Sequence, residues 1–180
     1  MQQMREVKVS NASGYTPQTL IIQRGDSVIW LNTESVASGI QHRPVPDDST
    51  LTWVASNIPP DSPSPQANFA AVGDFPYHDG VNPALKAKIV VAQGVVIGQN
   101  GDATAFVPAS VSIKKGQSVT WANETPMPLQ PTPDTGAAWF NQPIASGAIS
   151  APVRFDTAGT FPYHCIVPGK PNVKGTIKVS

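Results

Sequence analysis

The sequence predicts an all-β protein built from two Greek-key β-sandwich domains in tandem. Apolar side chains recur at every second position in short runs, as at Val28 and Trp30, which is the period of a β-strand. The 19 prolines and 14 glycines are spread through the chain and separate these runs with turns. No stretch shows a sustained apolar stripe of helical period, and about eight short strands in each half favour a Greek-key sandwich.

The second half of the chain repeats the pattern of the first. YTPQTLIIQRGDSVIW (15–30) and FVPASVSIKKGQSVTW (106–121) share an aromatic residue, a proline two positions later, a glycine and a closing tryptophan. Further along, the segment FPYH occurs at 75–78 and again at 161–164. Because the matching features keep nearly the same register in both halves, the chain carries an internal repeat.

Each repeat predicts one domain. KAKIVV (86–91) and KGTIKV (174–179) close the two copies, so we expect a first domain at 1–92 and a second at 94–180. The joint, AQG at 92–94, is short, and a tether of this length holds two domains close together.

Composition excludes several classes of function. The 12 basic and 12 acidic residues balance, which disfavours the basic surface of a non-specific nucleic-acid binder. No apolar run reaches the roughly 18 residues that a membrane-spanning helix needs, and the polar start MQQMREVKVS is no signal peptide. The single cysteine excludes an intrachain disulfide. Nucleophile-elbow and phosphate-loop motifs are missing, so we predict no enzyme.

Several motifs carry a resemblance to a known family. Each half has a strand, a glycine and a strand ending in Trp-x-Asn, followed by a Phe-Pro-Tyr-His segment and a closing strand. FDTAGTFPYHC (155–165) is the most specific stretch. The chain resembles cupredoxins, the blue-copper fold of plastocyanin and amicyanin. That resemblance implies copper held by a histidine on an early loop and by Cys, His and a weak axial Met on a late loop.

The first copy keeps one of these four ligand positions. In HRPVPD (42–47), His42 stands where the first histidine ligand belongs. On the late loop the resemblance aligns Asp79 with the cysteine, Asn82 with the second histidine and Leu85 with the methionine. Oxygen donors such as those of Asp79 and Asn82 are hard ligands that suit Cu(I) poorly.

The second copy also keeps one position, and it is a different one. Cys165 is present, whereas Leu129 replaces the first histidine and Pro168 the second. With a two-residue insertion, Val173 stands at the methionine position. The resemblance therefore implies two degenerate type 1 sites, with no cofactor as the first expectation and copper as a possible one.

Two interpretations of Cys165 stay open. It is either a small, buried, nearly apolar residue, or a reactive or soft-metal thiol with Met127 or His164 as its neighbour. Thiolate formation needs a nearby positive charge, and Lys170 is the obvious cation on that loop.

The three histidines have separate predictions. His78 and His164 share one position in the repeat, and strand alternation turns them away from the interior, so we expect hydrogen-bonding or surface roles. In two-domain nitrite reductases and multicopper oxidases the equivalent histidine binds a second copper, but such sites need further histidines. We expect His42 and Asp79 to form an ion pair or hydrogen bond; a weak Zn²⁺ or Cu²⁺ site with Asn82 or water is the alternative.

The sequence thus predicts a non-enzymatic cupredoxin-like module that binds an unknown protein partner through its former copper-end loops. A homo-oligomer is a further option for this partner. The resemblance implies a periplasmic or extracellular location. One alternative is a copper-binding or electron-transfer protein with a rearranged site around Cys165. Another is a subunit or fragment related to multicopper enzymes, completed by another chain.

Overall fold

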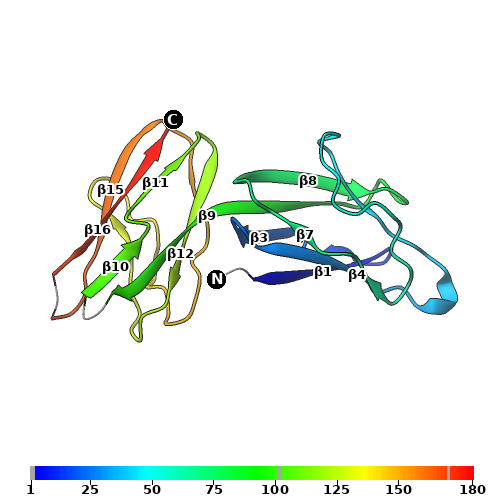
Figure 1. The fold of residues 1–180 in the computed structure, drawn as a ribbon, viewed down its shortest axis with the longest axis horizontal. Coiled ribbons are helices and arrows are strands. Elements are labelled where there is room, and N and C mark those ends of the chain that lie inside the picture. Colours follow the sequence, from blue (N-terminus) through cyan, green and yellow to red (C-terminus); the bar gives the residue numbers. More distant parts are fainter. Residues whose placement is uncertain (1–2, 101–102, 170) are drawn as a thin grey trace. The chain divides into compact units, whose positions relative to one another are not determined.

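The computed structural model describes residues 3–100, 103–169 and 171–180 and shows an all-β chain (Figure 1). The one helical segment within those ranges is the 3-10 turn η1 (Val36–Ser38). No helix in the same ranges is long and apolar enough to cross a membrane. The chain divides into two compact units, Met1–Val91 and Ala92–Ser180.

The first unit has two sheets. One has the order β2-β1-β4-β6, with β7 also paired to β4, and the other joins β5 to β8 and β8 to the first part of β9, which β3 also pairs. Their strands are β1 (Met4–Ser10), β2 (Gly14–Thr16), β3 (Thr19–Gln23), β4 (Ser27–Asn32), β5 (Pro44–Pro46), β6 (Ser62–Pro63), β7 (Ala67–Asn68), β8 (Gly73–Asp79) and β9 (Lys86–Asn100).

The core of this unit lies between the two sheets. Alternation along β4 buries Val28 and Trp30 completely, and the same core cluster contains Tyr77 of β8. The indole Nε1 of Trp30 donates a hydrogen bond to the Tyr77 hydroxyl at 3.1 Å, which links the two sheets. Trp53 stacks on Trp30 with ring centroids 5.6 Å apart and fills the adjoining space.

The second unit has the same pattern of strand pairs. One sheet has the order β14-β12-β9, with β10 also on β9, and the other has the order β11-β16-β15-β13. The strands are β10 (Ala103–Val107), β11 (Ser110–Ile113), β12 (Gln117–Asn123), β13 (Thr132–Pro133), β14 (Val153–Phe155), β15 (Gly159–Cys165) and β16 (Val173–Val179). Trp121 and Tyr163 occupy its core as Trp30 and Tyr77 occupy that of the first unit.

The short joint at 92–94 lies inside strand β9 and is not a loop. Val91 pairs with Gly73 in the first unit, and two residues later Gln93 pairs with Val119 in the second. Strand β9 therefore changes partner within the joint without leaving the extended conformation, because Val91, Gln93 and Gly94 all have partners in sheets.

Candidate functional site

A buried histidine–aspartate pair lies at the end of β8 in the first unit. The imidazole Nδ1 of His42 is 2.6 Å from Asp79 Oδ2, and both side chains are fully buried. His42 is held by backbone hydrogen bonds in both directions with Ile58, and Asp79 is the last residue of β8. The contact predicted between these two ligand positions is therefore present.

Asp79 also organises the loop that follows it. Its Oδ1 accepts hydrogen bonds from the backbone N–H of Val81 at 2.7 Å and of Asn82 at 3.1 Å. The Tyr15 hydroxyl donates to Oδ2 at 3.3 Å. The Asp79 N–H donates to the carbonyl of Leu85 at 2.9 Å, which closes the loop. Both carboxylate oxygens of Asp79 therefore accept hydrogen bonds from the surrounding chain.

A second carboxylate lies on the other side of the His42 ring. Nε2 of His42 is 3.5 Å from Glu34 Oε1, an ion-pair distance at which no hydrogen bond forms. The same oxygen of Glu34 accepts the backbone N–H of Asn11 at 2.6 Å. The side-chain amide of Asn82 donates to Asn11 Oδ1 at 3.1 Å, so it is used within the loops. The imidazole thus lies between two acidic side chains.

The geometry limits what this site can hold. At 2.6 Å the Nδ1 of His42 and the Oδ2 of Asp79 are bonded to each other, so an ion between these two atoms would require the pair to separate. Over the part of the chain that the structure describes, no group of three or more His, Cys, Asp or Glu side chains is placed to hold a metal ion. Burial, and then the Asp79 charge, raises the pKa of Tyr15, so its hydroxyl stays a donor.

The equivalent region of the second unit is apolar. Leu129 pairs through its backbone with Ile144, as His42 does with Ile58. Cys165 is fully buried here, and Phe106, Val167 and Val173, which belong to the same core cluster, are buried as well. Pro168, at the second histidine position, is exposed and carries no ligating atom on its side chain.

Cys165 has the environment of a core residue. Desolvation raises the pKa of its thiol, and a backbone hydrogen bond from Gln130 only partly opposes this shift. Met127 is a partly buried neighbour of the same core cluster, whereas the His164 side chain is engaged elsewhere. The predicted cation, Lys170, lies outside the described residues.

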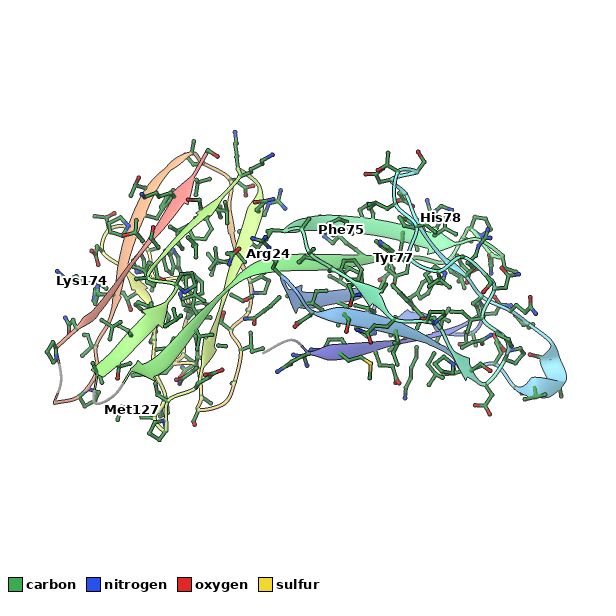
Figure 2. The ribbon with its side chains drawn as sticks, in the orientation of Figure 1. Arg24, Phe75, Tyr77, His78, Met127 and Lys174 are labelled. Carbon is green, nitrogen blue, oxygen red and sulfur yellow. The ribbon has the colours of Figure 1, made fainter. Side chains whose placement is uncertain are left out.

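Two surface histidines form matching pairs with aspartates. His78 Nδ1 is 2.7 Å from Asp47 Oδ1, and His164 Nδ1 is 2.6 Å from Asp134 Oδ1. Both histidines are partly exposed, and His78 follows Tyr77 on β8 (Figure 2). Sequence reasoning missed these partners, although the aspartates end equivalent Pro-x-Pro-Asp segments of the two repeats.

The first unit has two facing sheets, and His42 of an early loop packs against the end of the Phe-Pro-Tyr-His strand. This arrangement defines a cupredoxin-like protein. The chain is 34% identical over 100 residues to the plastocyanin of Scenedesmus fuscus, an alignment that covers 47% of this chain and 96% of that protein. The chain therefore belongs to the plastocyanin family, by a likeness that extends over about half of its length. It is also 37% identical over 95 residues to the chloroplastic plastocyanin of Tetradesmus obliquus, covering 48% of this chain and 63% of that protein.

Solved structures of amicyanin mutants also align with the chain. A reduced mutant has a TM-score of 0.42 at 20% identity and covers 49% of this chain and 81% of its own. A second reduced mutant has a TM-score of 0.41 at 21% identity and covers 48% of this chain and 79% of its own. No protein-family model matches the sequence.

Proposed function

We propose that both units are cupredoxin-like domains whose type 1 copper sites have degenerated, and that the protein is a non-enzymatic binding or structural module. The observation that carries the proposal is the buried hydrogen bond between His42 and Asp79. It joins directly the two loops that a copper ion would join in the family. A charge-assisted hydrogen bond of this kind stabilises loops without a metal.

The second unit supports the proposal by a different route. Where the first unit has Tyr15, His42 and Asp79, the second has Phe106, Leu129 and Cys165. Phe106 and Leu129 carry no ligating atom, and a buried thiol with a raised pKa is mostly in the protonated form that binds metals weakly. Apolar packing replaces the metal in this unit.

The rest of the proposal concerns the partner and the location of the protein. The former copper-end loops serve as a recognition surface for a protein partner, which in one form is a second copy of this chain. The protein acts outside the cytoplasm, in the periplasm or the extracellular space; one relative is named chloroplastic, which adds that compartment as an alternative.

Copper titration with metal analysis and a visible spectrum tests the proposal. Purified protein is mixed with Cu(II), freed of excess metal, and measured for bound copper and for an intense thiolate-to-copper band. We expect neither stoichiometric copper nor the band. Cys165→Ser is the matched variant for the thiol, and His42→Ala and His78→Ala are those for harder ligands.

The two alternatives predict other outcomes of the same experiment. An intense band that disappears in Cys165→Ser establishes the rearranged copper site and overturns the proposal. Stoichiometric copper without the band, lost in His42→Ala or His78→Ala, indicates a site of nitrogen and oxygen ligands. Copper that binds only after a histidine-rich partner chain is added supports the subunit or fragment alternative.

A further inference from the structure

Strand β3 (Thr19–Gln23) forms an open edge of a sheet in the first unit. It pairs with β9, and among the residues that the structure describes no further strand pairs with it (Figure 1). An open edge presents unpaired N–H and C=O groups to which another extended chain can be added. The segment from 17 to 23 reads PQTLIIQ and carries no charged side chain. This edge therefore lacks the charges that commonly protect an edge strand from pairing.

The backbone groups of Thr19 and Ile21 face the open edge. The carbonyl of Gln18 accepts the N–H of Lys88 in β9 at 2.9 Å, so position 18 directs its groups toward β9. Neighbouring residues of a strand direct their N–H and C=O groups to opposite sides. The groups of Leu20 therefore also point toward β9, and those of Thr19 and Ile21 point away from it.

The open part of the edge is short, because both of its ends are closed. Gln23 uses its backbone groups within a turn: its N–H donates to Oδ2 of Asp26 at 3.0 Å, and its carbonyl accepts the N–H of Asp26 at 3.0 Å. Pro17, at the other end, has no N–H to donate. A partner strand can therefore form its hydrogen-bond ladder with Thr19 and Ile21.

The side chains of this edge are apolar and accessible. Ile21 is 42% exposed, which is high for a large apolar side chain. Leu20, on the other face of the strand, is partly buried and packs against the core cluster of the first unit. A strand added at this edge would cover the remaining surface of Leu20 and part of that of Ile21. Burial of this apolar surface favours association.

The equivalent edge of the second unit is polar. Strand β11 forms that edge, and Ser112 stands in place of Ile21. Lys114 and Lys115 follow the outward-facing serine, and lysine beside an edge strand disfavours pairing. Strands β5 and β13, at other sheet edges, contain proline, which also blocks an added strand. The repeat thus supplies a matched edge that differs from β3 in the features that matter for pairing.

Two copies of β3 are complementary to each other. In an antiparallel pair that places Leu20 opposite Leu20 of a second copy, Thr19 lies opposite Ile21 in both directions. This register pairs every outward N–H and C=O group of Thr19 and Ile21. Leu20 then forms a non-hydrogen-bonded pair, the kind in which facing side chains lie closest. Because the contact is the same from either copy, it closes as a two-fold dimer.

We propose that β3 binds a second copy of this chain, by antiparallel pairing of the two β3 strands about a two-fold axis at Leu20. The interface uses the sheet edge and none of the residues at the copper positions. It therefore forms whether or not the copper-end loops bind another partner.

Sedimentation velocity of the full chain from about 10 µM to about 1 mM, together with NMR, tests the proposal. We expect a monomer that converts to a dimer as the concentration rises. The amides of Thr19 and Ile21 should exchange with solvent at least about tenfold more slowly in the dimer, because they donate hydrogen bonds only there. A chain that is monomeric at every concentration overturns the proposal. A dimer whose chemical shifts change at 79–85 instead of 18–22 overturns it too.

Ile21→Lys gives the edge the kind of charge that disfavours pairing. We expect it to raise the dissociation constant of the dimer at least about tenfold. The substituted side chain is exposed, so the variant should fold. Ser112→Lys places the same charge at the equivalent position of β11 and is the matched control, which should leave the dissociation constant unchanged. Equal weakening by the two substitutions overturns the proposal.

Ile21→Pro is an independent variant, because it removes the N–H that faces the open edge and no hydrogen bond to β9. We expect it to weaken the dimer as Ile21→Lys does. The NMR spectrum of the first unit reports whether each variant is folded, and the folded variant decides. An unchanged dissociation constant in a folded variant of Ile21 overturns the proposal.

Discussion

Three residues that meet at the end of β8 in the first unit are replaced together in the second. Tyr15, His42 and Asp79 form a chain of polar contacts, whereas the equivalent Phe106, Leu129 and Cys165 form apolar ones. The three polar residues contact one another through hydrogen bonds, which buried polar groups need, and the three residues of the second unit pack without needing such partners. A mixture of the two sets leaves a buried donor or acceptor unpaired.

This difference predicts a non-additive effect on stability. Asp79→Ala leaves His42 and Tyr15 without their buried acceptor, and we expect it to lower the free energy of unfolding by about 3–5 kcal/mol. The triple variant Tyr15→Phe, His42→Leu, Asp79→Cys installs the apolar set and should lose much less. Urea unfolding followed by tryptophan fluorescence measures both. A triple variant as unstable as Asp79→Ala would contradict the self-consistency of the two sets.

The buried acidic groups of the second unit predict a loss of stability at high pH. Burial raises the pKa of Cys165, and it raises the pKa of Tyr163 to about 12. The folded state therefore holds these protons more tightly than the unfolded state. Their stabilising contribution is complete below the unfolded-state pKa values, about 8.5 for Cys and about 10 for Tyr, and is lost as pH rises through the folded values.

Free energies of unfolding measured from pH 7 upward, in the wild type and in Cys165→Val, test this expectation. The wild type should begin to lose stability above about pH 8.5, and Cys165→Val should keep its stability to about pH 10. Identical profiles for the two proteins would show that the thiol is not shielded in the folded state.

Among the secondary-structure elements, the strands were predictable from apolar side chains at every second position, because this alternation is a local property of the sequence. The contact between His42 and Asp79 was predictable from aligned ligand positions. The approach of Glu34 to His42 was not, because it depends on how the loop after β4 folds back. Asp47 and Asp134 were also missed, since a cross-strand partner depends on register, which a single strand does not reveal.

Strand β9 predicts slow hydrogen exchange at the joint. Residues 92–94 belong to a continuous strand in which Val91 pairs in a sheet of the first unit and Gln93 and Gly94 pair in a sheet of the second. We expect the amides of 92–96, as a group, to exchange as slowly as those elsewhere in β9. Exchange at the rate of an unstructured peptide would show that the joint is a flexible linker. Hydrogen–deuterium exchange resolved by NMR distinguishes the two.

The whole chain consists of two units with similar strand pairing. About half of its length aligns with plastocyanin. The residues at the positions aligned with the family's copper ligands differ between the two units. The strand pairs and aromatic cores are alike in both units despite this. We infer that the fold of this protein is stabilised by its aromatic cores and strand pairs, and that its loops at the copper end are free to take another function.

In the first unit we propose that the hydrogen bond between His42 and Asp79 occupies the place that a metal has in the family. The most direct measurement is the ¹H–¹⁵N NMR spectrum of the three histidine rings on addition of one equivalent of Cu(II), which broadens the signals of any ring that it approaches. We predict that the His42 Nδ1–H signal stays sharp, and that any broadening is confined to the partly exposed His78 and His164. Selective loss of the His42 signal at one equivalent would show that copper binds at the His42–Asp79 pair.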